Sequence, residues 1–137
     1  MAKIEGGCLC GQLRYSTDAD PIFTGACHCK NCQKLTGSAF SVVVAVPSPS
    51  MTVTGETKVF DSKGDSGQGT HYTFCPTCGS PVTDTADVMQ GVTMIRAGTM
   101  DDTSGLQPTM EIFCDSKQPW VSLGGIPQSF PKMPMPG

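Results

Sequence analysis

The stretch Cys27-His28-Cys29-Lys30-Asn31-Cys32 holds three of the eight cysteines within six residues. Two further cysteine pairs flank it: Cys8-Leu9-Cys10-Gly11 lies upstream, and Cys75-Pro76-Thr77-Cys78-Gly79 lies downstream. Cysteines two or three positions apart rarely reach the Cα separation and Cβ direction of a relaxed disulfide. The same spacings let two thiolates face one metal ion, as in C-x2-C zinc sites. The clusters therefore indicate metal binding rather than a disulfide framework.

Seven of the eight cysteines fall in these clusters, and two closed tetrahedral zinc sites would need eight ligands. Cys10 and Cys78 are each followed directly by glycine, which lets the chain turn sharply while backbone N–H groups point back at sulfur. Cys32 is followed by Gln33, so no glycine allows a sharp turn directly after it. We therefore predict one structural four-cysteine site, formed by Cys8, Cys10, Cys75 and Cys78.

The remaining cluster would hold a second ion with three protein ligands: Cys27, Cys29 and Cys32. An open fourth position is typical of catalytic zinc. Two alternatives remain open here: a closed structural zinc completed by Cys114 or His28, and an iron–sulfur cluster, which favours a fourth cysteine. In an extended segment His28 would point away from its cysteine neighbours, which favours a hydrogen-bonding or surface role. Cys114 ends an apolar segment and is expected to be a small buried hydrophobe.

Composition narrows the class of protein. The 137 residues suit one domain with a single core, and 16 glycines with 11 prolines indicate many turns. The formal net charge is −3 and no run of Lys or Arg occurs, which argues against a nucleic-acid partner. No stretch approaches the roughly 18 apolar residues of a membrane-spanning helix. The first residues lack the apolar region of a signal peptide, which, with reduced cysteines, predicts a cytoplasmic protein.

Short apolar segments separated by turn residues recur about every 8 to 12 residues, which predicts an all-β fold. The expected strands are 12–16, 22–26, 39–46, 51–54, 57–60, 71–74, 81–84, 91–96 and 109–114. Gly55-Glu56 is expected to form a two-residue hairpin between 51–54 and 57–60. Residues 30–35 are expected to form one helical turn that ends at Gly37, with Cys29 and Cys32 near its N-terminus.

The remaining segments carry weaker signals. Residues 61–69 are interpreted as a loop and are the best candidate for a lid. His71 is expected to make a cross-strand contact, and Trp120 is expected to anchor the core. From residue 124 onward, four prolines predict a tail with little regular structure. Four basic residues are expected to be surface charges unless an anionic ligand is involved: Lys30, Lys34, Arg96 and Lys117.

Taken together, the motifs resemble the glutathione-dependent formaldehyde-activating enzyme family, which also includes centromere protein V. The resemblance lies in Gly7-Cys8-x-Cys10-Gly11, Cys27-His28-Cys29-x-x-Cys32 and Phe74-Cys75-x-x-Cys78-Gly79-Ser80-Pro81, and it continues through 97–102 and 108–120. It implies a β-tent fold, which we place at residues 1–123, with a Pro-rich tail at 124–137. It also implies a structural zinc on Cys8, Cys10, Cys75 and Cys78, and a catalytic zinc on Cys27, Cys29 and Cys32. Many family members carry His where Glu111 stands.

The expected reaction follows from this ligand set and from the resemblance. Three thiolates reduce Zn²⁺ to a formal −1 centre, which disfavours hydroxide chemistry and suits a soft fourth ligand such as a substrate thiolate. The resemblance implies that glutathione is this thiol and that its sulfur adds to an aldehyde such as formaldehyde, as in an S-(hydroxymethyl)glutathione synthase, a carbon–sulfur lyase. A related glutathione adduct is the other substrate that this resemblance allows. Lys30 and Lys34 would then face the carboxylates of glutathione. The alternative is a zinc-stabilised binding module without chemistry, which a fourth protein ligand would favour.

Overall fold

Short strands make up most of the regular structure, as the closely spaced apolar segments predict. The computed structural model describes residues 3–64 and 67–133. Within these residues, one α-helix, α1 (Lys30–Thr36), is joined by three short 3-10 helices, η1 (Ser48–Ser50), η2 (Ala97–Thr99) and η3 (Cys114–Ser116). The strands are β1 (Ile4–Gly7), β2 (Arg14–Thr17), β3 (Phe23–Cys27), β4 (Ser41–Pro47), β5 (Thr52–Thr54), β6 (Lys58–Lys63), β7 (Gly69–Phe74), β8 (Pro81–Ala86), β9 (Val92–Arg96), β10 (Met110–Ile112) and β11 (Gln128–Ser129). The expected all-β single domain is confirmed.

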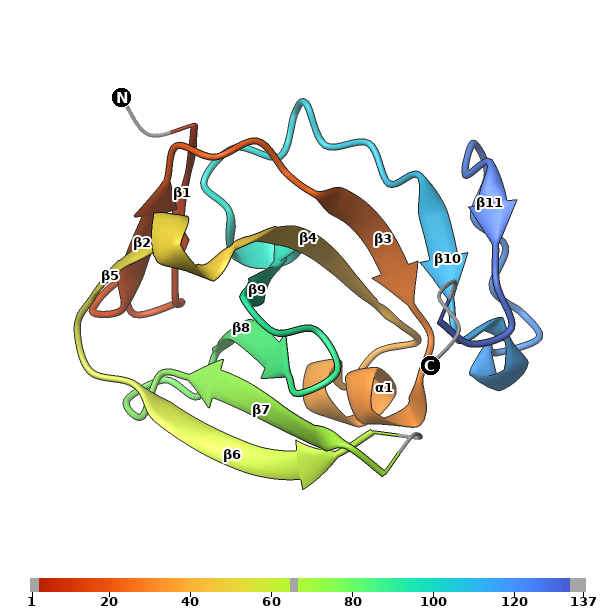
Figure 1. The fold of residues 1–137 in the computed structure, drawn as a ribbon, viewed down its shortest axis with the longest axis horizontal. Helices are drawn as coiled ribbons and strands as arrows, with labels where there is room; N and C mark the ends of the chain where they lie inside the picture. The colour runs from red at the N-terminus through yellow and green to blue at the C-terminus, as the bar shows by residue number, and fades with distance from the viewer. Residues whose placement is uncertain (1–2, 65–66, 134–137) are drawn as a thin grey trace.

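The strands form two sheets. The smaller sheet has the order β1-β2-β5, and the larger sheet has the order β11-β10-β3-β4-β9-β8-β7-β6. The pairs are antiparallel except that β10 runs parallel to both β3 and β11. In Figure 1 the smaller sheet stands at one end of the molecule and β10 and β11 stand at the other. The helix α1 lies between the β6–β7 pair and the ends of β3 and β10 (Figure 1).

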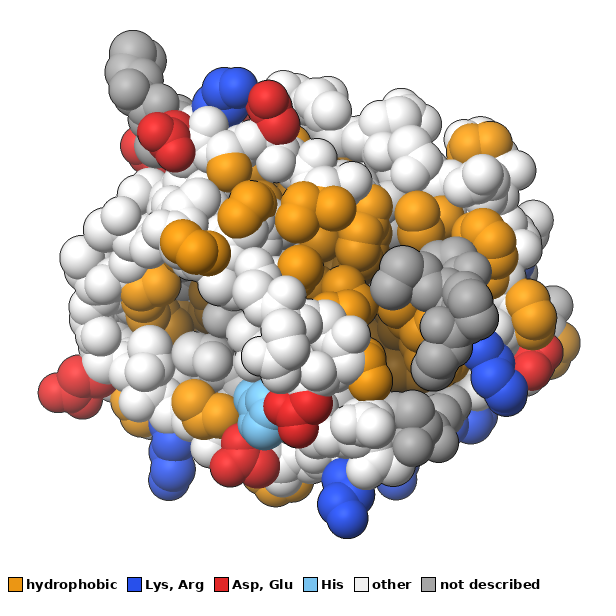
Figure 2. Space-filling model, viewed as in Figure 1, with side chains coloured by type: hydrophobic (Ala, Val, Ile, Leu, Met, Phe, Trp, Pro, Cys, Tyr) orange, Lys and Arg blue, Asp and Glu red, His pale blue; other side chains and the backbone are white. Residues whose placement is uncertain are grey.

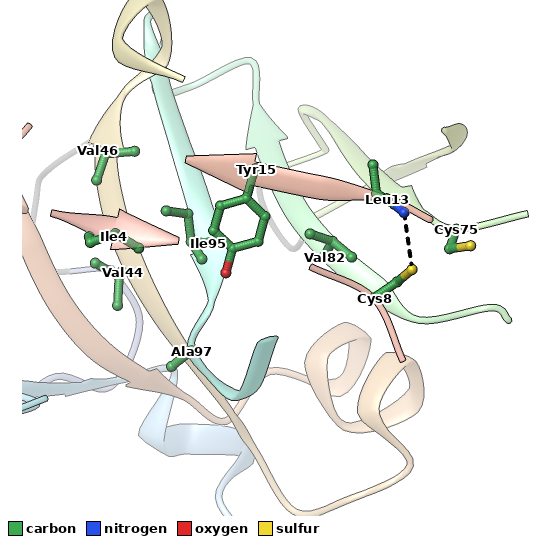
Figure 3. Packing of buried hydrophobic residues seen from close by; sticks show 10 residues of the cluster. All are labelled: Ile4, Cys8, Leu13, Tyr15, Val44, Val46, Cys75, Val82, Ile95 and Ala97. Carbon is green, nitrogen blue, oxygen red and sulfur yellow. Dashed lines mark hydrogen bonds between the residues drawn. The ribbon is translucent and has the colours of Figure 1, made fainter. Parts of the chain in front are cut away.

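Two apolar clusters lie inside the described part of the chain. The main core joins residues of both sheets and consists of Ile4, Cys8, Leu13, Tyr15, Val44, Val46, Cys75, Val82, Ile95 and Ala97. Figure 3 shows Tyr15 in the middle of this core, with Cys8 and Cys75 at one end. The smaller core consists of Cys27, Cys32 and Ile112. Cysteines of the two expected metal sites therefore belong to different cores.

The predicted hairpin around Gly55-Glu56 is wrong. β5 pairs with β2 in the smaller sheet, whereas β6 pairs with β7 in the larger sheet, so the two strands diverge. The side chain of Gln12 explains the divergence. Its amide nitrogen donates to the carbonyl of Glu56 (2.8 Å), and its amide oxygen accepts from the Glu56 N–H (2.9 Å). A tertiary contact holds the segment where the local sequence predicts a tight turn.

Three further expectations change. β6 extends to Lys63 and β7 begins at Gly69, so the expected loop 61–69 narrows to 64–68, of which 65–66 lie outside the described residues. The expected tail contains β11, which pairs with β10. Trp120 is 73% exposed and does not anchor the core. Strand pairing decides the first two outcomes, within the β6–β7 hairpin and between β10 and β11.

The surface combines apolar and charged side chains. On the face shown in Figure 2, apolar side chains gather around β3 and β4, and charged side chains lie near the rim.

His71 makes the expected cross-strand contact, with Nδ1 2.7 Å from Asp61 and Nε2 2.9 Å from Asp87. Hydrogen bonds to these two carboxylates raise the pKa of His71. Within the described residues, no helix has the length and apolar character needed to cross a membrane.

Candidate metal centres

Two turns that each carry two cysteines, called knuckles below, meet where the two sheets adjoin. Cys8 and Cys10 lie in the turn from β1 to β2, and Cys75 and Cys78 lie in the turn from β7 to β8. All four sulfur atoms lie within 4.8 Å of one another. The Sγ of Cys10 is 3.5 Å from that of Cys8 and 3.8 Å from that of Cys75. Four converging thiols are the donor set of a closed tetrahedral zinc site.

Backbone N–H groups point at the sulfurs of this four-cysteine cluster. The N–H of Leu13 donates to Cys8 Sγ at 3.3 Å. The N–H groups of Thr77 and Cys78 donate to Cys75 Sγ at 3.3 and 3.4 Å. Hydrogen bonds to the ionised form of a group favour that form. The knuckles are therefore shaped to hold thiolates, as the glycine-terminated motifs predict.

Two glycines and one serine complete the knuckles. Gly11 and Gly79 turn with φ of 85° and 79°, in the left-handed region that glycine adopts without steric cost. The hydroxyl of Ser80 lies 3.2 Å from Cys78 Sγ. Its hydrogen bond is the main cause that lowers the pKa of Cys78 to about 5. A low thiol pKa favours metal binding, because the thiolate is the ligand.

The three-cysteine cluster comes from two consecutive elements. Cys27 ends β3, Cys29 is the N-cap residue of α1, and Cys32 lies in the first turn of that helix. Their sulfur atoms lie within 4.8 Å of one another. Cys29 Sγ accepts the N–H of Cys32 at 3.3 Å, so this sulfur caps the helix where free N–H groups favour negative charge. Gly37 ends the helix with φ of 65°, as predicted.

Without a cation, these three sulfurs compete for protons. Hydrogen bonds from Cys27 and Cys29, helped by the charge of Arg96 and the hydroxyl of Ser41, lower the pKa of Cys32 to about 2. Hydrogen bonds to the other two sulfurs raise the pKa of Cys27. Cys27 acts to lower the pKa of Cys29, but Cys32 and burial outweigh it and raise that pKa to about 11. A divalent cation would replace the two remaining protons and let all three residues act as thiolates.

No fourth potential ligand of the described residues joins the three-cysteine cluster. His28, Glu111 and Cys114 form a separate group, with ligand atoms within 4.8 Å of one another. His28 is fully buried, and its Nε2 lies 3.0 Å from Glu111 Oε1. The Lys117 ammonium lies 3.1 Å from the same oxygen and supplies the cation there. The hydrogen-bonding role expected for His28 is confirmed, whereas Cys114 lies half-buried in η3 rather than in a strand.

A buried charged pair lies beside the three-cysteine cluster, and the expectation that Arg96 is a surface charge is wrong. The side chains of Arg96 and Asp84 are 6% and 7% exposed, with Nη2 2.7 Å from Oδ2. Burial raises the pKa of Asp84 to about 7, against the opposing charge of Arg96. Strand alternation could place Arg96 on the same face as Met94. Which face this is follows only from strand pairing: β9 pairs with β4, and β4 pairs with β3, which carries Cys27 on the same face.

The C-terminal segment also contacts the three-cysteine cluster. The proline content of this segment predicts a tail and gives no sign of this contact. The N–H of Phe130 donates to the carbonyl of Glu111 at 2.9 Å, and the N–H of Cys114 donates to the carbonyl of Phe130 at 3.0 Å. Phe130 and Met133 pack against the smaller core. An aromatic residue within a proline-rich segment is the one sequence signal that could indicate such an anchor.

Lys30 and Lys34 are both exposed on α1, as expected. Residues four positions apart lie on one face of a helix, so the two ammonium groups share one side of α1. Two surface hollows lie away from both cysteine clusters: one against β1, β2 and β5, the other at the turn from β8 to β9. Neither hollow is lined by a cysteine of the two clusters.

Comparisons with known proteins support this picture. The model of the family described as glutathione-dependent formaldehyde-activating enzyme matches residues 3–116. Among solved structures, a Rhodobacter sphaeroides protein has a TM-score of 0.58 to this chain and 14% sequence identity. The alignment covers 76% of this chain and 91% of that protein, and at such identity it shows the fold alone. No curated protein sequence matches this chain.

Proposed function

This chain belongs to the glutathione-dependent formaldehyde-activating enzyme family, and we propose that it is a zinc-dependent carbon–sulfur lyase that joins glutathione to an aldehyde. The proposed catalytic residues are Cys27, Cys29 and Cys32. One observation carries the proposal: the three sulfurs converge, and no fourth ligand from the described residues completes the set. An incomplete ligand set leaves room for a ligand from the substrate.

Zinc fits both clusters by the chemistry of their donors. Thiolates select soft or borderline ions, and a C-x2-C pair is a common zinc motif. We assign a structural zinc to Cys8, Cys10, Cys75 and Cys78, and a catalytic zinc to the three-cysteine cluster. When bound there, zinc would keep a substrate thiol as a thiolate, because a formal −1 centre is too weak a Lewis acid to favour hydroxide.

The proposed reaction is the addition of a thiol to a carbonyl group. The glutathione sulfur forms a bond to the aldehyde carbon, the C=O π bond opens, and the carbonyl oxygen takes up the proton that the thiol lost. With formaldehyde the product is S-(hydroxymethyl)glutathione, and the reverse reaction breaks the same carbon–sulfur bond. With zinc bound, the protein would contribute three deprotonated cysteines, of which Cys27 and Cys32 are buried in the smaller core.

Lys30 and Lys34 support glutathione as the thiol. Their ammonium groups are exposed on the helix whose N-terminal residues carry Cys29 and Cys32. Glutathione has two carboxylates, which these two charges would attract. Replacing each lysine with Gln should raise KM for glutathione while kcat stays near that of the wild type, because the charges would act on binding alone.

All eight cysteines are free, which supports a reducing, cytosol-like compartment for the protein.

Cobalt substitution tests the proposal directly. Cobalt in a thiolate site gives a visible spectrum that depends on the number of sulfur ligands. Addition of glutathione to protein with two cobalt ions should change this spectrum, and the analogue with serine in place of cysteine should leave it unchanged. Formaldehyde should then exchange into S-(hydroxymethyl)glutathione faster than without protein, as measured by NMR exchange spectroscopy.

Two variants control this experiment. Cys29→Ser should lose the response to glutathione, whereas Cys114→Ala should keep it, since Cys114 lies outside both clusters. Protein with two metal ions whose spectrum ignores glutathione would refute thiol capture at the three-cysteine cluster. A spectral response without faster exchange of any aldehyde would instead favour the non-catalytic binding module.

A further inference from the structure

Arg96 lies on the same sheet face as the three-cysteine cluster. The pairing of β3 with β4 places Cys27 opposite Ser41, and the pairing of β4 with β9 places Val43 opposite Arg96. Alternate residues of a strand share a face, so Ser41 and Val43 project to the same side. Cys27, Ser41 and Arg96 therefore stand on one face, and α1 brings Cys32 to it.

Asp84 holds the guanidinium group of Arg96 from the neighbouring strand β8. Arg96 Nη2 lies 2.7 Å from Asp84 Oδ2, and Arg96 Nε lies 3.3 Å from Asp84 Oδ1. A two-point contact between an arginine and a carboxylate fixes the plane of the guanidinium. All nine Lys and Arg residues lie in the described part of the chain, and Arg96 alone among them is buried.

One donor of this buried cation has no acceptor. Arg96 Nη1 is buried and makes no hydrogen bond, and Nη2 is held by its ion pair with Asp84 Oδ2 alone. Burying a charged donor without an acceptor is costly, so a nearby acceptor is expected. The Cys32 sulfur fits this role, because Cys32 is buried at the start of α1 beside the sheet face that carries Arg96, and the two side chains are close enough to interact.

We propose that Arg96 is a positioning residue of the three-cysteine site, which donates to the Cys32 thiolate and offsets its charge so that a fourth, anionic sulfur can bind. This inference rests on the function proposed above. Three thiolates around a divalent ion carry −1, and a substrate thiolate raises this to −2. A guanidinium buried in the same water-poor region offsets one of these charges at short range. Asp84 keeps the guanidinium in place.

A purely structural ion pair makes a different prediction. Replacing both of its partners would change only the stability of the fold, and the folded protein would bind metal and thiol as before. The test therefore measures metal and thiol affinity as well as stability. Arg96 cannot be replaced alone by a neutral residue, because Asp84 would then remain as an unpaired buried charge and destabilise the fold.

The variant that avoids this problem replaces both partners, Arg96→Gln together with Asp84→Asn. It removes both charges and keeps two polar side chains that can bond to each other. We expect its three-cysteine cluster to bind cobalt about 10- to 100-fold more weakly, the range typical for loss of a group that supports a metal ligand. Glutathione affinity of the cobalt form should fall at least as much. The four-cysteine cluster of the same molecule should keep its metal affinity and serves as the internal control.

Arg96→Lys, which keeps the charge but loses the planar fork, should restore part of the glutathione affinity. A double variant that folds and binds cobalt and glutathione like the wild type would overturn the proposal, whatever its melting temperature. If wild-type protein itself fails to respond to glutathione, the proposed function fails, and the cobalt affinities alone then decide the role of Arg96.

A measurement on wild-type protein covers the case in which the double variant does not fold. Protein loaded with ¹¹³Cd should show NMR scalar coupling between the metal and a guanidinium proton of Arg96, transmitted through the hydrogen bond to the Cys32 sulfur. Absence of this coupling, with the Arg96 protons observed, would show that the guanidinium does not donate to a metal ligand. The proposal would then be wrong.

Discussion

The four-cysteine cluster and the three-cysteine cluster use the same side chain but join different parts of the molecule. Cys8 and Cys10 leave the smaller sheet, while Cys75 and Cys78 connect two strands of the larger sheet. Cys8 and Cys75 also belong to the main core (Figure 3). A metal ion in this cluster would therefore join both sheets and close a long loop of the chain.

The three-cysteine cluster is local by comparison. Its residues lie within six positions, at the end of β3 and the start of α1, and they pack in the smaller core. A metal ion there closes only a short loop, so it constrains the unfolded chain less than an ion in the four-cysteine cluster does. The difference supports the proposed division between a cluster that stabilises the fold and a cluster that serves chemistry.

The largest effect is expected for Cys75→Ser. Structural zinc has an apparent binding energy on the order of 10 kcal/mol, comparable with the whole stability of a domain. Cys75 is fully buried in the main core, so loss of its thiolate should give insoluble or protease-sensitive protein. Limited proteolysis and thermal unfolding would measure this. Cys114→Ser, outside both clusters, should unfold at the wild-type temperature, and a Cys75→Ser variant that does the same would remove the structural role of this cluster.

Cys29→Ser should have a smaller effect and separates the two clusters. Serine is a good N-cap residue, so the side chain at position 29 should still accept the N–H of Cys32 and α1 should persist. We expect folded protein with one zinc per chain instead of two, shown by elemental analysis and circular dichroism. If Cys29→Ser unfolded the domain as Cys75→Ser does, the contrast between the clusters would be wrong.

The sequence predicts the local parts of this contrast well. The glycines after Cys10 and Cys78 predict turns with N–H groups at sulfur, and both glycines have the expected left-handed conformation. The end of α1 at Gly37 was likewise predictable from a single residue. These features are accessible because the residues that cause them are adjacent in the chain.

Features that depend on distant pairing escape sequence analysis. The hairpin at Gly55-Glu56 fails because the amide of Gln12 holds the segment. Arg96 is predicted to be a surface charge because its partner Asp84 lies on another strand and is not apparent from the local sequence. Phe130 lies in a segment whose prolines suggest a free tail, although its backbone pairs with that of Glu111. Each error concerns a contact between residues 12 or more positions apart.

Phe130→Ala tests whether the C-terminal segment supports one cluster alone. Phe130 packs on the smaller core and has no contact with the main core among the described members of the two clusters. Loss of this half-buried ring should lower the free energy of unfolding by about 1–2 kcal/mol, less than for a fully buried phenylalanine. Metal should leave the three-cysteine cluster faster, while its release from the four-cysteine cluster stays unchanged.

Trp120→Ala is the matched control, because this aromatic residue of the same region is 73% exposed and should be neutral. Cobalt release to a chelator, followed at the absorbance of each cluster, distinguishes the two variants. Equal effects on both clusters would show that residues 124–137 act on the domain as a whole. This experiment also addresses the predicted division between residues 1–123 and 124–137.

The smallest difference concerns two serines that stand beside one sulfur in each cluster. The Ser80 hydroxyl is the main cause that lowers the pKa of Cys78, whereas Ser41 is a minor cause for Cys32. Protons displace metal as the pH falls, and a low thiol pKa postpones this displacement. Ser80→Ala should therefore raise the pKa of Cys78 and move metal release from the four-cysteine cluster to higher pH.

Ser41→Ala should shift the pH of metal release from the three-cysteine cluster less, because other sulfurs and Arg96 still favour the Cys32 thiolate. A pH titration of cobalt absorbance measures both shifts, and each variant contains the other cluster as its control. A larger shift for Ser41→Ala would mean that one hydroxyl, rather than the neighbouring sulfurs and the guanidinium, keeps Cys32 ionised. Ser41 belongs to β4, whereas Ser80 belongs to the turn that carries Cys78. Ionisation in the three-cysteine cluster would then depend on a residue of the neighbouring strand more strongly than ionisation in the four-cysteine cluster depends on its own turn.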